Sequence, residues 1–334
     1  MKFSLAPISM LEWDRIISLN PQALLFHTSI WLNLLSEVYG CSWHPLGIWD
    51  NGQLIGGFPL QIHKLGPFRL AGSPLMQVIA STPFLGLSVP LEIIPSILPA
   101  LEEYLSVAHI AHIEIAYPNE VDVSPYLAWG YTAEVCDTVI LEIGGRSQAN
   151  IWNGLSSSCR RAIRKAENGP ILIIEPQDGN FIPAYYSLCQ EVYRFAGRTP
   201  HLGLDFYSVL WNRLSSSGYL KVLLAVLDDM IIAGALFLVY KDTVYYLSGA
   251  SREAALSLRP NNLLQWHFIE WASAHGFQKY DLGGAVVPGI TRFKLSFGGS
   301  CQSYTRVFRA RSTLAQMGRA VYKIAIPSWR CIKR

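Results

Sequence analysis

This sequence has little charge and lacks the patterns that mark a membrane span, a metal site or a nucleotide-binding loop. Only 15% of its 334 residues are charged, and Pro, Glu or His interrupts each apolar stretch before the roughly 20 residues that span a bilayer. The six cysteines are dispersed, and no HExxH pair, Walker loop or GxGxxG is present. We therefore expect reduced thiols, no metal and no bound cofactor. The N-terminus lacks an apolar signal-peptide core, which favours a cytoplasmic protein.

Charge is unevenly distributed along the chain. The formal net charge is only +3, so there is no overall nucleic-acid signature. After Asp281, however, every charged residue is basic. A terminus of one sign suggests contact with phosphates, tRNA or the inner face of an anionic plasma membrane. The alternative is a solvated basic terminus.

A weak internal repeat organises the chain. Residues 51–57 (NGQLIGG) match residues 228–234 (DDMIIAG), and each segment joins two apolar strands. In both copies a helix precedes this hairpin, and a strand, a helix and a further strand follow it. We expect strands at 46–49, 58–63, 68–72 and 113–116, and at 222–227, 235–240, 244–249 and 279–282. Such an order predicts an α/β protein with two mixed, mostly antiparallel sheets flanked by helices. A chance match of short strand patterns is the alternative.

The glycine-rich segment at 144–147 predicts a boundary between the two copies. We therefore divide the chain into an N-terminal domain, 1–145, a C-terminal domain, 146–312, and a basic amphipathic tail, 313–334. One helix is expected from 148 to 168. The tail places apolar side chains beside Trp329 and terminal cations, a pattern that suits a peripheral membrane contact. Packing of the tail onto the second domain is the alternative.

The stretch from 258 to 299 holds most of the chemistry-bearing residues. A polar loop with Arg259, Asn261 and Asn262 opens the expected helix 263–275, and a helix start is a ready anion site. The following strand ends at Asp281 and a double glycine. Arg292-Phe293-Lys294 then follows, which we place near a strand end. A phosphate-bearing donor and a positioned cation are the expected chemistry.

A second basic segment reads RRAIRKA. On one helix, Arg160, Arg161, Arg164 and Lys165 fall at i, i+1, i+4 and i+5, which places four cations on one stripe. Like charges at this spacing repel, so an anionic ligand accounts for the pattern. A solvated helix face is the alternative.

Together, RRAIRKA and YDLGG…GITRFKLSFGG resemble the FemAB-like and BioF2-like acyltransferases of the GNAT superfamily. The resemblance covers most of the chain and implies two tandem GNAT-like domains. In Fem-type aminoacyltransferases the lysine matching Lys294 is implied to stabilise charge near the reacting ester, and the residue matching Phe293 lines the same place. The Q/R-x-x-G-x-G/A signature of ordinary GNAT enzymes is missing, since this position reads SLRPNN. Simple acetyl-CoA use is therefore in doubt.

From these features we expect acyl or aminoacyl transfer to an amino group, with acyl-CoA or aminoacyl-tRNA as co-substrate. The resemblance implies an acceptor in cell-envelope, glycolipid or exopolysaccharide biosynthesis, including lipid-linked precursors. Lys294 would stabilise the oxyanion, and Asp281 would act as general base, hold a cation or cap the glycine turn. Asn261 and Asn262 would cap the helix or contact the donor. The alternative function is a non-catalytic module that binds a phosphate-bearing ligand or nucleic acid.

Overall fold

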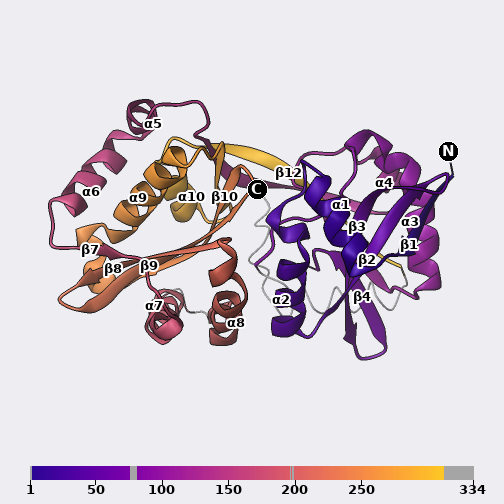
Figure 1. The fold of residues 1–334 in the computed structure, drawn as a ribbon, viewed down its shortest axis with the longest axis horizontal. Helices are drawn as coiled ribbons and strands as arrows, with labels where there is room; N and C mark the ends of the chain where they lie inside the picture. Colours follow the sequence, from indigo (N-terminus) through magenta and orange to yellow (C-terminus); the bar gives the residue numbers. More distant parts are fainter. Residues whose placement is uncertain (1, 76–80, 196, 198, 312–334) are drawn as a thin grey trace. The chain divides into compact units, whose positions relative to one another are not determined.

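The computed structural model describes residues 2–75, 81–195, 197 and 199–311 (Figure 1). The chain forms two compact units, and each is described here by itself. The first contains the residues up to Asp137 together with those from Ser303, and the second runs from Thr138 to Gln302. This division differs from the predicted domains, because the chain leaves the first unit inside a strand rather than at 144–147, and residues from 303 return to the first unit. The tail 313–334 lies outside the described residues.

The first unit has strands in the order β1-β2-β3-β4-β5-β12, and β6 begins in it. The strands are β1 Phe3–Pro7, β2 Ser42–Asp50, β3 Gln53–Leu65, β4 Phe68–Ser73, β5 His112–Ala116, β6 Thr132–Glu142 and β12 Ser300–Ala310. Its helices are α1 Met10–Leu19, α2 Ser29–Tyr39, α3 Ile94–Val107 and α4 Ser124–Ala128. Gly57 faces Trp13 of α1, whereas its neighbour Phe58 lies in the core with α3. Since neighbouring strand residues point to opposite faces, α1 and α3 cover opposite faces.

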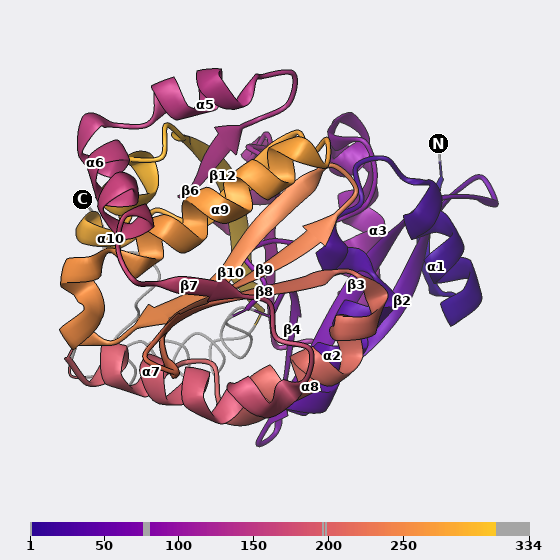
Figure 2. The same cartoon turned by 60° about the vertical axis from the view of Figure 1, so that its left-hand side comes forward.

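The second unit has the order β7-β8-β9-β10-β11-β6. Its strands are β7 Leu172–Ile174, β8 Leu220–Leu227, β9 Met230–Tyr240, β10 Thr243–Ser251 and β11 Lys279–Gly284. Its helices are α5 Gln148–Gly154, α6 Ser157–Glu167, α7 Ile182–Phe195, α8 Leu204–Leu214, α9 Pro260–Ala274 and α10 Pro288–Leu295. Figure 2 shows α6 and α9 on one face of the sheet and α7 and α8 on the other. Side-chain alternation agrees, because Gly234 faces Tyr185 of α7 while Ala233 and Ala235 lie in the core beneath α9.

The predicted repeat is confirmed. Each unit contains an antiparallel meander, β2-β3-β4 or β8-β9-β10, and its last strand pairs in parallel with a strand that follows a helix. That strand, β5 or β11, is in turn antiparallel to β12 or β6. The third residue of β5 is Glu114 and the third residue of β11 is Asp281. The two acidic residues therefore occupy equivalent positions.

The expected single helix from 148 to 168 is wrong. Helix α5 ends at Gly154, and Ser156 begins α6 by accepting a hydrogen bond at Oγ from the backbone N–H of Cys159 (3.1 Å). A serine in this role satisfies a backbone donor that an N-terminal helix turn leaves free. Two short helices at an angle therefore replace one long helix.

A buried ion pair crosses the sheet of the first unit. Glu114 is fully buried, and its Oε2 lies 2.7 Å from a guanidinium nitrogen of Arg306, which is 8% exposed. Arg306 also lies 3.4 Å from a carboxylate oxygen of Glu134. A buried charge is tolerated only with partners of this kind. The pair joins β5 to β12, the strand that returns from the second unit.

Replacing the arginine should destabilise the first unit. Arg306→Met removes the guanidinium from a carboxylate that stays buried, so we expect the free energy of unfolding to fall by about 3–5 kcal/mol. Chemical denaturation measures this loss. Arg252→Met is the control, since Arg252 pairs with Glu191 at 3.8 Å while 41% of its side chain is exposed, and such pairs contribute about 0–1 kcal/mol. Equal losses in the two variants would contradict the prediction.

Candidate active site

The site lies where β10 and β11 stop pairing. Their parallel ladder runs from Thr243–Lys279 to Tyr245–Asp281. Immediately beyond it, β10 shifts its register with β9 between Tyr246 and Ser248, and β11 shifts its register with β6 between Asp281 and Gly284. Each strand therefore turns away from the other, and backbone groups that a continuous ladder would occupy become available to a ligand.

Lys294 lies on helix α10 beside this opening. Its side chain is close to the end of β11, as expected, but the residue belongs to a helix and not to a strand. Its side chain is buried, with the residue 8% exposed, and Nζ donates a hydrogen bond to the carbonyl oxygen of Gly284 (2.9 Å). Gly283 has φ +82°, and a Cβ there would lie 3.4 Å from Nζ of Lys294 and 3.7 Å from the carbonyl oxygen of Tyr246. Glycine thus keeps the lysine close to both strands. Burial lowers the pKa of Lys294 to about 8, although the charge of Asp281 opposes this shift.

Asp281 is 3% exposed and shares the site with Lys294. Its Oδ1 accepts hydrogen bonds from the hydroxyl of Thr138 and from the backbone N–H of Gly283 (2.8 Å). The second contact is the turn-capping role considered from the sequence. Burial raises the pKa of Asp281, while the two hydrogen bonds and the charge of Lys294 act in the opposite direction. The carboxyl group therefore has both a structural contact and an unusual protonation equilibrium.

The other two residues of the Arg-Phe-Lys motif divide between solvent and core. Arg292 is exposed on α10. Phe293 is partly buried and packs edge-on against Phe297, with ring centroids 5.2 Å apart. The motif thus places one buried cation and one exposed cation on the same short helix.

Helix α6 carries the four predicted cations, and their contacts differ. Arg160 donates hydrogen bonds to the carbonyl oxygens of Asn153 (3.0 Å) and Leu155, at the end of α5. The guanidinium of Arg164 lies over the ring of Trp152, 5.4 Å from its centroid. Arg161 and Lys165 are exposed. Arg160 and Arg164 therefore have contacts within the fold, and Arg164 is exposed together with Arg161 and Lys165.

The polar start of α9 is used for packing. Pro260 begins this helix, earlier than expected, and Arg259 precedes it with φ +63° and an exposed side chain. Asn261 donates to the hydroxyl of Ser251 (3.0 Å), and Asn262 donates to Sγ of Cys159 (3.7 Å). These side chains connect α9 to β10 and α6 and do not cap the helix, since α9 has no side-chain cap.

Sequence reasoning missed Thr138 and the strand hydroxyls near the opening. Thr138 lies 143 residues before Asp281 in the chain, and no local pattern connects them. Ser248 follows the register shift of β10 and contacts two tyrosines of α7 and α8. Both positions depend on pairing between segments that are distant in the sequence. The internal repeat is the one sequence feature that indicates such pairing.

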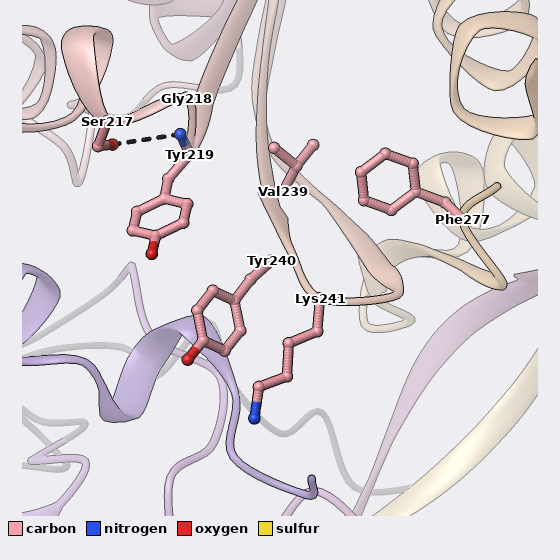
Figure 3. Close-up of a pocket in the computed structure, with 7 residues that line it drawn as sticks. All are labelled: Ser217, Gly218, Tyr219, Val239, Tyr240, Lys241 and Phe277. Atoms are coloured by element: carbon pink, nitrogen blue, oxygen red, sulfur yellow. Dashed lines mark hydrogen bonds between the residues drawn. The ribbon is translucent and has the colours of Figure 1, made fainter. Parts of the chain in front are cut away.

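A pocket of about 220 Å³ lies at the other end of these strands (Figure 3). Tyr219, Tyr240, Lys241 and Phe277 line it, together with Ser217, Gly218 and Val239. These residues lie where β9 ends and where β10 and β11 begin, away from Lys294. Over the described part of the chain, no three His, Cys, Asp or Glu side chains gather as metal ligands. No helix placed by the structure has the length and hydropathy of a membrane span.

Comparison with known proteins identifies the domain type. Residues 155–295 match the family model of the acetyltransferase (GNAT) domain. Among solved structures, the chain is similar to FemX, with 16% identity, 91% of this chain and 97% of that chain covered, and a TM-score of 0.72. No curated protein matches the sequence.

Two further solved structures have the same fold. The C-terminal domain of a candidate lysylphosphatidylglycerol synthetase from Agrobacterium fabrum shares 11% identity, with 95% and 98% covered and a TM-score of 0.61. A tandem GNAT protein from the clavulanic acid biosynthesis pathway shares 9% identity, with 92% and 98% covered and a TM-score of 0.57. At these identities the similarity establishes the fold alone.

Burial of Lys294 should reduce stability in a pH-dependent way. Below about pH 8 the lysine is charged in both the folded and the unfolded state, so the folded state bears the full cost of its burial. Between about pH 8 and 10.5 the folded state loses the proton first, and this cost disappears. Lys294→Met should therefore be more stable than wild type at pH 7, and this advantage should shrink by about 3 kcal/mol by pH 10.5.

Denaturation curves at pH 7, 9 and 10.5 measure this difference. Lys279→Met is the matched control, because Lys279 is an exposed lysine on the adjacent strand β11. An advantage of Lys294→Met that stays constant across this pH range would show that the lysine carries no burial cost.

Proposed function

Because residues 155–295 match the family model of the acetyltransferase (GNAT) domain and the fold is similar to that of FemX, we propose that the chain is a FemAB-like acyltransferase that transfers an acyl or aminoacyl group from a phosphate-bearing donor to an amine. The acceptor we propose is a precursor of the cell envelope, a glycolipid or an exopolysaccharide. The observation that carries the proposal is the buried ammonium group of Lys294, held by Gly284 where β10 and β11 part and within the electrostatic influence of Asp281.

The two buried groups suit the two charge changes of acyl transfer. When the amine attacks the carbonyl carbon, a C–N bond forms and the carbonyl oxygen becomes an oxyanion. Lys294, protonated below about pH 8, stabilises that oxyanion in a site that excludes water. Asp281 accepts the proton from the attacking nitrogen, since its raised pKa makes it a stronger base. Collapse of the intermediate breaks the ester or thioester bond, and the leaving group departs.

Exposed cations near the site support a phosphate-bearing donor. Arg259 at the start of α9, Arg292 on α10 and the pair Arg161 and Lys165 on α6 are all exposed. Such side chains attract phosphate groups of either coenzyme A or tRNA. The similarity in fold to a candidate lysylphosphatidylglycerol synthetase supports a lipid-linked acceptor. The GNAT domain match favours acyl-CoA.

The second candidate function is a binding module without chemistry, built on two GNAT folds. The burial of Lys294 weighs against it, because a module has no need of an ammonium group held at this energetic cost. Consumption of the donor separates the two functions. The purified protein should be incubated with acetyl-CoA and with alanyl-tRNA in parallel, with an amino sugar as acceptor.

Removal of the lysine should abolish most of this transfer. Lys294→Ala should lower kcat by about 10²–10³, with a much smaller change in donor Kd, because the contact strengthens in the transition state. Lys294→Arg should restore only part of the rate, since the planar guanidinium places its charge elsewhere. Phe293→Ala should raise KM instead. Steady-state kinetics and circular dichroism test these expectations, and a folded Lys294→Ala protein with wild-type kcat would move the catalytic role to Asp281.

Charge reversal on α6 should weaken donor binding. In the double variant Arg161→Glu and Lys165→Glu, two exposed cations become anions, so donor Kd should rise and its dependence on salt should become less steep. Titration at several salt concentrations measures both. Arg213→Glu is the control, because it reverses one cation on helix α8, which covers the other face of the sheet. If donor Kd at low salt is the same in the double variant and in wild type, Arg161 and Lys165 do not bind the donor and are only solvated.

A further inference from the structure

Three hydroxyl groups meet beside the opening between β10 and β11. The hydroxyl of Ser248 lies 2.8 Å from that of Tyr185 on α7 and 3.0 Å from that of Tyr207 on α8. Tyr185 is 0% exposed and Tyr207 is 4% exposed, whereas Ser248 is half-buried. Two buried phenols from different helices therefore converge on the one member of the group that solvent or a ligand can reach.

Ser248 lies level with Gly284, the last residue of β11, at the opening. The last parallel pair is Tyr245–Asp281, and the register shift of β10 lies between Tyr246 and Ser248. Strand β11 also has one extra residue, between Asp281 and Gly284. Counting along both strands with one extra residue in each brings Ser248 level with Gly284. Since Nζ of Lys294 on α10 donates to the carbonyl oxygen of Gly284, the serine and the lysine border the same opening.

The side chains of Ser248 and Asp281 lie on the same face of the sheet. Tyr280 and Leu282 belong to the core beneath α9, so Asp281 between them points to the α7 and α8 face. The charge of Asp281 also acts on Tyr245, adding to the effect of burial that raises the pKa of this tyrosine. The serine, reached by tyrosines from α7 and α8, points to that face as well.

The number of hydrogen bonds that the Ser248 hydroxyl can make determines whether its proton is left to donate to a ligand. A serine hydroxyl has two acceptor sites and one donor proton. When both phenols donate to Ser248, its acceptor sites are filled and its proton remains for a ligand. The thiol of Cys189, 3.6 Å from the hydroxyl of Tyr207, can then donate to that oxygen. Donation by two phenols also polarises the serine, which makes it a better donor.

We propose that the Ser248 hydroxyl donates a hydrogen bond to the carbonyl oxygen of the acyl group that is transferred. The inference rests on the proposed function and adds a second donor to the site, in addition to Lys294. An ester and a thioester both present this oxygen, so the role is the same for either donor. Tyr185 and Tyr207 are positioning residues, which hold the serine oxygen and direct its proton into the opening.

Infrared spectroscopy of the bound donor tests this contact directly. Acetyl-CoA and alanyl-tRNA, each labelled with ¹³C at the carbonyl, are bound without amine, and the carbonyl band is measured for wild type and variants. A hydrogen bond lowers the carbonyl frequency, so Ser248→Ala should raise it, and Ser248→Thr, which keeps the hydroxyl, should leave it near the wild-type value. Ser248→Ala should also lower kcat by about 10²-fold while KM changes much less.

The positioning role has its own test. Tyr207→Phe should raise the carbonyl frequency by part of the Ser248→Ala shift, and should have no further effect in the Ser248→Ala protein, because the tyrosine acts through the serine. Tyr186→Phe is the matched control, since it removes the same atom one residue from Tyr185 on α7. Equal shifts in Tyr186→Phe and Tyr207→Phe would remove the positioning role.

The outcomes separate this inference from the proposed function. If wild type binds a labelled donor and Ser248→Ala keeps the same carbonyl frequency, the serine contact is wrong and the proposed function stands. If wild type binds neither donor, the proposed function fails and the serine contact fails with it. A raised frequency in Ser248→Ala, with the wild-type value in Ser248→Thr, supports the contact.

Discussion

β10 and β11 share a parallel ladder of only three residue pairs, and each then changes its register with its other neighbour. A longer ladder would use the backbone groups of both strands and leave no place for a ligand between them. Gly283, with its positive φ, lies at this point and leaves room for the side chain of Lys294. The positions of Lys294, Asp281 and Ser248 relative to one another all follow from this short ladder.

The site keeps its charges out of water. Lys294 and Asp281 are both buried, and burial shifts their pKa values toward each other. A group that is expensive to keep in its charged form responds strongly to a nearby change of charge, such as the formation of an oxyanion. The backbone carbonyl of Gly284 and the hydroxyl of Thr138 hold these groups in place before any ligand arrives. The burial of Lys294 and Asp281 thus lowers the stability of the folded protein and also keeps both side chains in fixed positions.

The sequence predicts the repeat well because each copy contains a pattern of neighbouring residues: an apolar strand, a polar turn and a second apolar strand. It predicts helix α10 poorly. Phe293, Leu295 and Phe297 alternate as in a strand, while Ile290, Phe293 and Phe297 also follow helical spacing. Only the packing of the side chains distinguishes the strand pattern from the helix pattern. Phe297 is fully buried whereas Leu295 is 37% exposed, which agrees with the helical spacing.

Contacts between distant segments account for the rest of the site. The pattern of Arg160 and Arg164 on α6 correctly gives a cationic helix face. It gives no sign that one guanidinium binds the end of α5 and the other covers Trp152. The hydroxyls that converge on Ser248 come from helices about 40 and 60 residues earlier in the chain, and no motif connects them.

The two copies of the fold differ in the partner of one carboxylate. Glu114 and Asp281 occupy equivalent strand positions, and the residue that reaches each comes from the equivalent place on the neighbouring antiparallel strand, Arg306 on β12 and Thr138 on β6. A guanidinium stays protonated at every physiological pH, so the carboxylate of Glu114 has a permanently charged partner. The threonine hydroxyl is neutral, and its hydrogen bond lowers the pKa of Asp281 against the larger effect of burial. At this one strand position, therefore, one copy of the fold holds a permanent cation and the other holds a neutral hydroxyl.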